Sequence, residues 1–180
     1  MAEIDEFAMS LLEESKRFLE KARECPDAPG EVAYLHAALM LAFCSLEAHT
    51  NAIAADFALD NSLSVHEKAL LLEKDVRLED GEFKIHPSLK VMRLEDRIQF
   101  LHLRFSGQPL NRSETWWSEL RSAIVLRNQL THPKEAGEIA RGNVERAVTA
   151  IIDTLNAVFL AVYRKGFPSA SRGLSSRLDF

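Results

Sequence analysis

Apolar residues recur every three to four positions along most of the chain, the spacing that places side chains on one face of a helix. The first such run precedes Pro26 and predicts an amphipathic helix. A second, longer run over residues 31–58 is the most apolar, so we expect it to form the central helix of the fold. Pro29 and Gly30 are interpreted as a break between these two helices.

The region after the central helix contains a helix start and a turn. Ser64 is followed three residues later by Glu67, a spacing typical of a capping box, and this predicts a third helix over residues 64–78. The dipeptide Asp80-Gly81 favours a tight turn. A small hairpin is therefore expected within residues 76–86.

Three further helices are predicted in the second half of the chain. Helical spacing covers residues 89–105 and again residues 113–131. Because Pro133 cannot continue a helix comfortably, the second of these stops at or just before His132. The last helix is expected to begin with Asn143 as its N-cap.

These elements predict an all-α fold, a helical bundle of five to six helices with at most one small hairpin. We assign residues 1–166 to a single domain, in which residues 31–58 and 144–162 are expected to be among the most buried. Residues 167–180 are expected to form a polar, partly basic C-terminal tail. Residues 164–177 include four basic residues and no acidic one. That stretch is interpreted either as a phosphate-steering segment or as a solvated chain end.

The composition fits one globular core, because 47% of the 180 residues are hydrophobic and 27% are charged. A net charge of −5 argues against a protein that coats nucleic acid, so any contact with RNA is expected to be local. Residues 1–6 are acidic where a secretory signal would be basic, and no apolar stretch approaches the roughly 20 residues of a membrane span. A cytoplasmic protein without a membrane partner is expected.

Several classes of enzyme are excluded by missing motifs. The chain has no Gly-rich phosphate loop, no Cys-x-x-Cys pair and no His-Glu-x-x-His sequence. Its six histidines are scattered without ligand spacing, and its two cysteines do not form a disulfide framework. We therefore expect neither a metal nor a cofactor.

The strongest candidate for chemistry is the segment Arg127-Asn128-Gln129-Leu130-Thr131-His132 at the predicted helix end. At about 100° per residue, the directions of Arg127 and His132 differ by roughly 140°, so spacing alone does not bring them together. Asn128 and His132 differ by about 40° and share a face. Arg127 meets His132 if the helix ends or distorts before Pro133, if its long side chain curls round, or if the two residues belong to different subunits.

This segment resembles the signature of HEPN domains, small all-α proteins with an Arg, four to six residues and then a His, often with Asn, Asp or His directly after the Arg. Ser45-Leu46-Glu47-Ala48-His49-Thr50-Asn51 is similar to the first core helix of that family, where an acidic residue and an Asn face the site. The resemblance implies a homodimer in which two such motifs line one cleft. It also implies a metal-independent endoribonuclease, acting as a toxin or a defence component.

Each residue then has an expected role in cleaving RNA. His132 would move a proton and Arg127 would stabilise the phosphorane oxygens, so these two are the candidate catalytic residues. Asn128 would orient His132 or bind phosphate. Glu47 would hold Arg127 in place, with Asn51 in the same network. The product would end in a 2′,3′-cyclic phosphate.

Two alternatives stay open. The first is a non-catalytic HEPN-like helical dimer that binds a nucleotide or a partner protein, such as an antitoxin or a regulatory protein. The second is an unrelated helical bundle. In that case Arg127 and His132 would only offset the helix dipole and bond the last carbonyl groups.

Overall fold

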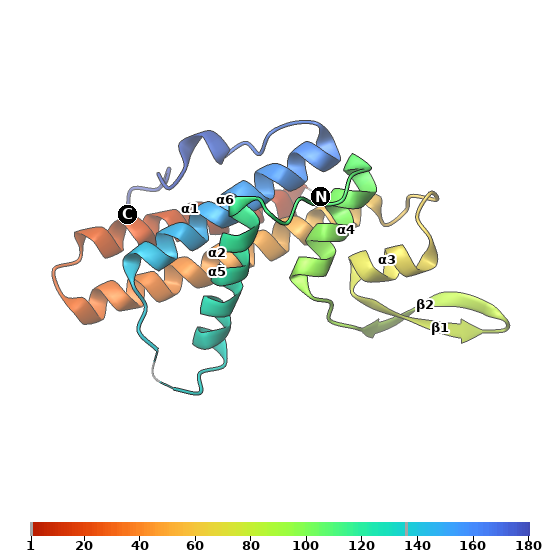
Figure 1. Cartoon of the computed structure of the whole chain (residues 1–180), viewed down its shortest axis with the longest axis horizontal. Helices are drawn as coiled ribbons and strands as arrows, with labels where there is room; N and C mark the ends of the chain where they lie inside the picture. The colour runs from red at the N-terminus through yellow and green to blue at the C-terminus, as the bar shows by residue number, and fades with distance from the viewer. Residues whose placement is uncertain (1, 136) are drawn as a thin grey trace.

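The computed structural model describes residues 2–135 and 137–180, and it is mainly helical with one small hairpin (Figure 1). The prediction of an all-α bundle with a single hairpin is confirmed for this part of the chain. The elements in chain order are α1 (Ala2–Glu24), α2 (Ala28–Phe57), α3 (Val65–Leu72), β1 (Lys74–Glu79), β2 (Glu82–Leu89), α4 (Leu94–Ser106), α5 (Thr115–Thr131), α6 (Arg141–Tyr163) and the short 3-10 helix η1 (Ala170–Arg172).

The long helices α1, α2 and α6 lie side by side, and α4 and α5 cross them (Figure 1). As predicted, α2 and α6 supply most of the buried apolar side chains. Core residues that are at most 2% exposed include Leu12 and Leu19 of α1, Leu39, Leu46 and Ile53 of α2, Ile98 and Leu101 of α4, Leu120 of α5, and Val148, Ile151 and Leu155 of α6. By length and apolar composition α2 and α6 could each cross a membrane, but core helices share these properties, so a membrane location is only weakly supported.

The start of α2 differs from the prediction, because Pro29 and Gly30 belong to its first turn rather than to a break. A proline is tolerated there, since the first N–H groups of a helix have no partner within the helix. The Asp27 side chain accepts a hydrogen bond from the Gly30 N–H at 2.8 Å and caps the helix. The separation between α1 and α2 is thus only three residues long.

The capping box at the start of α3 is confirmed, with Ser64 and Glu67 bonded reciprocally. The helix ends at Leu72, earlier than predicted, because Glu73 adopts a left-handed conformation with φ of 51°. Residues 74–79 instead form β1 and pair with β2, in agreement with the alternation of Val76 and Leu78 with polar residues. The predicted hairpin is confirmed and is longer than expected.

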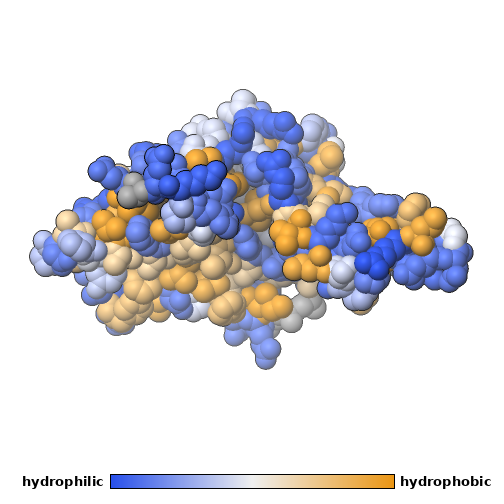
Figure 2. Space-filling view, turned by 90° about the horizontal axis from the view of Figure 1, so that it is seen from below, coloured by the Kyte–Doolittle hydropathy of each residue, from blue (hydrophilic) through white to orange (hydrophobic). Residues whose placement is uncertain are grey.

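Asp80 and Gly81 form the hairpin turn, and both have positive φ, 54° and 84°. Two-residue hairpin turns often require this conformation, which explains the Asp-Gly pair. Leu78 and Phe83 are opposite each other near the turn and are 65% and 58% exposed. Seen from below, the outer end of the hairpin carries apolar surface (Figure 2).

Two helix starts also differ from the predictions. The helix α4 begins at Leu94 rather than near residue 89, because residues 82–89 form β2. The N-cap of α6 is Ala140, so the prediction that Asn143 caps this helix is wrong. Asn143 lies in the first turn, where its side chain accepts a hydrogen bond from Arg146.

The segment 167–180 packs against the bundle through the buried Phe167 and through polar contacts with α1. Phe167 is 3% exposed, and the Arg172 guanidinium donates to Glu13 at 2.6 Å. The Arg177 N–H donates to the same carboxylate at 2.7 Å. Burial opposes the charged form of Glu13, but these groups and Lys16 outweigh it and lower the pKa of the carboxyl.

The buried imidazole of His49 makes the fold sensitive to acid. His49 is 2% exposed and packs edge-on against Phe159 and Phe167, and neither ring nitrogen has a partner among the described residues. Burial lowers the pKa of His49 from 6.5 to about 4. Between about pH 4 and pH 6.5 the unfolded chain therefore binds a proton on His49 that the folded protein does not bind. The free energy of unfolding falls as the pH drops below about 6.5.

We expect the free energy of unfolding to fall by about 2 kcal/mol between pH 7 and pH 5 because of His49 alone. The variant His49→Phe keeps an aromatic ring at this position but cannot take up a proton. Urea unfolding of both proteins at the two pH values measures the difference. An equal loss of stability in the wild type and in the variant would contradict this account.

Candidate functional site

The candidate site lies at the C-terminal end of α5, at the lower edge of the molecule in Figure 1. The helix ends at Thr131 as predicted, and His132 is its C-cap with φ of −133° and ψ of 60°. Pro133 explains this conformation, since a proline disfavours helical geometry in the residue before it. The His132 N–H still donates to the Asn128 carbonyl at 2.9 Å, and the His132 side chain is exposed.

Arg127 is directed toward α2 rather than toward His132. Its guanidinium carbon lies 5.0 Å from the centre of the Phe43 ring, a cation–π contact. Its Nη1 atom is 3.6 Å from a Glu47 carboxylate oxygen. The structure thus brings Arg127 and Glu47 together.

The Arg127 side chain is 24% exposed, so its cationic group is not sealed from solvent. Its Nε atom is buried and has no hydrogen-bond partner among the described residues. Because the Nε atom is buried, only the Nη groups of this partly exposed guanidinium can receive an anion.

Asn51 is not brought to Arg127. Its amide oxygen accepts a hydrogen bond of 2.7 Å from Nη2 of Arg97, a residue that is 3% exposed. The same guanidinium donates to the Leu71 carbonyl at 2.9 Å and pairs with Glu73 at 3.2 Å. Asn51 therefore belongs to a second cluster, at the base of the hairpin.

Glu47 connects the two clusters electrostatically. Burial lowers the pKa of Arg97, while the negative charges of Glu73 and Glu47 act in the opposite direction. Glu47 is thus close enough to stabilise the charges of both Arg127 and Arg97. A link from Asn51 to Arg127 runs through Arg97 and Glu47 and is indirect.

His132 and Asn128 open on a cleft of about 640 Å³. Its other lining residues are Val125, Gln129, Lys134, Glu135, Gly137 and Glu138. Arg127 is not among these lining residues. Within one subunit, His132 and Arg127 therefore lie on different faces of α5. This agrees with the angle of about 140° between them.

Other types of active group have less support. Burial and the neighbouring Glu47 raise the pKa of the Cys44 thiol, which disfavours a thiolate nucleophile. In residues 2–135 and 137–180, no group of three or more His, Cys, Asp or Glu side chains is placed to hold a metal ion.

Three residues near the site were not predicted from the sequence. Phe43 lies four residues before Glu47 on the same face of α2, so helical spacing could have identified it. Lys134 follows directly after the motif and could have been read as a cation beside it. Nothing local points to Arg97, because it is 46 positions after Asn51 in the sequence.

Comparisons of the chain with protein-family models, with curated proteins and with solved structures find no match. The resemblance to HEPN domains therefore depends on Arg127, Asn128 and His132, and on the α2 segment that contains Glu47.

Proposed function

We propose that this protein is a metal-independent endoribonuclease of the HEPN type. The observation that carries the proposal is the arrangement at the end of α5. Arg127 is held against Phe43 and Glu47, while His132, five residues later, is exposed on a cleft as the C-cap. One helix end thus offers a fixed cation and a proton-transfer group.

The chemistry needs no external nucleophile, because RNA carries a 2′-hydroxyl beside each phosphodiester. A base removes the 2′-hydroxyl proton, the 2′-oxygen attacks phosphorus, and the bond from phosphorus to the 5′-oxygen breaks as that oxygen takes up a proton. Histidine exchanges protons near neutral pH, so His132 suits either proton transfer. Arg127 would stabilise the extra negative charge on the phosphorane oxygens. The products end in a 2′,3′-cyclic phosphate and a 5′-hydroxyl.

A homodimer would bring Arg127 and His132 together although they lie on different faces of α5 within one subunit. An isologous interface repeats the same surface on both subunits. If the C-terminal half of α5 forms it, Arg127 of one subunit can approach His132 of the partner subunit.

The charge distribution favours a small contact area for RNA. Lys134 lines the same cleft as His132, but so do the carboxylates Glu135 and Glu138. Repulsion by these carboxylates limits nonspecific binding of phosphate chains. We propose that the protein acts in the cytoplasm, as a toxin or defence component restrained by an antitoxin or regulatory protein.

Incubation of the purified protein with labelled RNA in the presence of EDTA tests this function. We expect fragments with 2′,3′-cyclic phosphate ends, because the mechanism uses the 2′-oxygen and no metal. Phosphatase resistance of the 3′ ends identifies the cyclic product. Fragments that form only with added divalent metal, or that carry 3′-hydroxyl ends, would exclude the proposed mechanism.

The second candidate is a non-catalytic dimer that binds a nucleotide or a partner protein. The net charge of −5 and the carboxylates of Glu135 and Glu138 at the cleft favour it. A dimer that binds nucleotide but leaves RNA intact under all conditions would support this candidate.

A further inference from the structure

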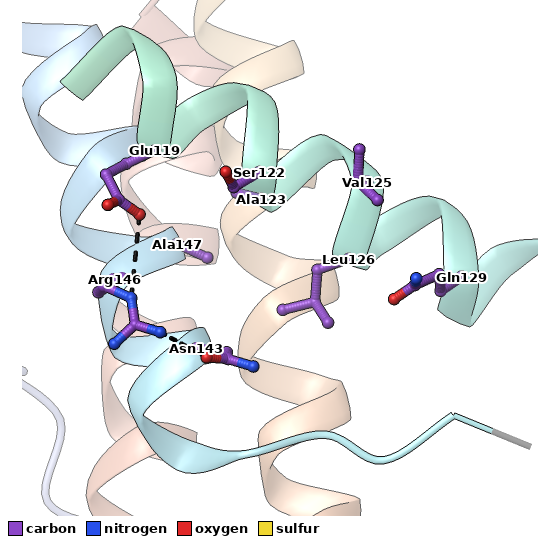
Figure 3. Close-up of a pocket in the computed structure, with 9 residues that line it drawn as sticks. All are labelled: Glu119, Ser122, Ala123, Val125, Leu126, Gln129, Asn143, Arg146 and Ala147. Carbon is purple, nitrogen blue, oxygen red and sulfur yellow. Dashed lines mark hydrogen bonds and ion pairs between the residues drawn. The ribbon is translucent and has the colours of Figure 1, made fainter. Parts of the chain in front are cut away.

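A groove of about 390 Å³ lies between α5 and α6, next to the cleft of His132 (Figure 3). Its α5 wall includes Ser122, Val125 and Gln129, and its α6 wall includes Asn143 and Arg146. In Figure 3 the Arg146 side chain points toward Glu119 across the groove.

The groove and the cleft are continuous, because Val125 and Gln129 line both. Ser122, Val125, Gln129 and His132 are spaced three and four residues apart and therefore share one face of α5. At about 1.5 Å per residue, Ser122 and His132 are separated by roughly 15 Å along the helix. A chain of a few nucleotides covers that distance.

Arg146 is the cation of this groove and is available to a ligand. Its side chain is 60% exposed, and it donates a hydrogen bond to the Asn143 side chain one turn earlier, which orients the guanidinium. Its ion pair with Glu119 is long, 3.9 Å, and both side chains are accessible to water. Such a pair contributes little, so a phosphate oxygen can replace the carboxylate.

We propose that the groove between α5 and α6 binds single-stranded RNA next to the cleaved bond, and that Arg146 contacts a phosphate of that strand. The proposal rests on the ribonuclease function. Adjacent packed helices have axes about 8–10 Å apart, a spacing that favours one strand over a duplex. The strand would leave the surface beyond Arg146, because the next pocket is lined by Glu114, Glu145 and Asp153.

Binding of a labelled single-stranded RNA of about 12 nucleotides, measured by fluorescence anisotropy, tests the proposal. The His132→Ala protein is used as background, so that the RNA stays intact. We expect Arg146→Ala to weaken binding about 3- to 10-fold and to reduce the slope of log K against log salt by about 0.7. Glu119→Gln removes the competing carboxylate and should tighten binding. Arg146→Lys should keep most of the salt dependence.

Arg121→Ala is the matched control, because Arg121 is on the same helix and 67% exposed, but lines a different pocket. It should leave RNA binding unchanged. A dinucleoside monophosphate, too short to reach Arg146, should bind the background protein and the Arg146→Ala protein equally. Unchanged binding of the longer RNA by both Arg146→Ala and Glu119→Gln would overturn the proposal.

The results distinguish failure of the ribonuclease function from failure of the proposed RNA binding in the groove. If the wild-type protein does not cleave RNA but Arg146→Ala still weakens its binding, the ribonuclease function is wrong and the groove binds RNA. If the wild-type protein cleaves RNA and Arg146→Ala changes neither binding nor cleavage of the longer substrate, the groove proposal is wrong and the ribonuclease function stands.

Discussion

Replacement of His132 by alanine is expected to lower the rate of RNA cleavage by about 100- to 10,000-fold, the usual contribution of a positioned acid or base. Arg127→Ala should lower it by about 100- to 1,000-fold, because the phosphorane charge loses its main cation. The His132 side chain is exposed at a helix end, so its removal should change the free energy of unfolding by less than about 0.5 kcal/mol. Arg127→Ala also loses the contact with Phe43, and we expect a cost of about 1 kcal/mol.

Single-turnover cleavage and thermal melting, measured on the same preparations, separate catalysis from folding. His102→Ala on α4 and Arg121→Ala on α5 are the matched controls and should retain wild-type rates. Variants of His132 and Arg127 that unfold along with their loss of activity would favour a structural role for the motif. Full activity in both variants would exclude these residues from catalysis.

Glu13→Ala is expected to destabilise the fold by about 3–5 kcal/mol, the range for removing one partner of a buried ion pair. The Lys16 side chain is fully inaccessible, and its ammonium lies 3.4 Å from the Glu13 carboxylate. The same carboxylate anchors the C-terminal segment through Arg172, Ser169 and the Arg177 N–H. Loss of the Glu13 carboxylate leaves the buried Lys16 ammonium without its partner and removes the contacts that hold the C-terminal segment.

Urea unfolding gives the loss of stability, and limited proteolysis reports release of residues 167–180. Glu14→Ala is the control, because Glu14 is the next residue of α1 and bonds only to Ser10 among the described residues. Adding Lys16→Met to the Glu13→Ala protein removes the orphaned charge and should restore part of the stability. Equal stability of the Glu13→Ala and Glu14→Ala proteins would contradict this account.

The parts of the fold that local chemistry determines were predictable from the sequence. Helical spacing identified the buried helices, Pro133 marked the end of α5, and Asp80-Gly81 marked the hairpin turn. The predicted end of the third helix was wrong, because pairing across the hairpin decides the conformation of residues 74–79. Val76 and Leu78 alternate with polar residues, which is a strand pattern.

In the candidate site, the local features were predictable and the contacts between distant residues were not. The order Arg127, Asn128 and His132 is readable in the sequence, and so is the angle that separates Arg127 from His132. The bond between Asn51 and Arg97 was not predictable, because it joins residues 46 positions apart. The anchoring of the C-terminal segment on Glu13 was missed for the same reason.

The measurement that tests the shared ribonuclease site most directly is the activity of a mixed dimer. Co-expression of Arg127→Ala and His132→Ala subunits with different tags allows the heterodimer to be purified. If each site uses Arg127 of one subunit and His132 of the other, one of its two sites keeps both residues. We predict about half of the wild-type rate per dimer, while each homodimeric variant stays at about 1% of that rate or less. A contaminating nuclease cannot produce such a gain. A heterodimer no more active than the two variants alone, or a protein that stays monomeric at micromolar concentration, would contradict the shared site.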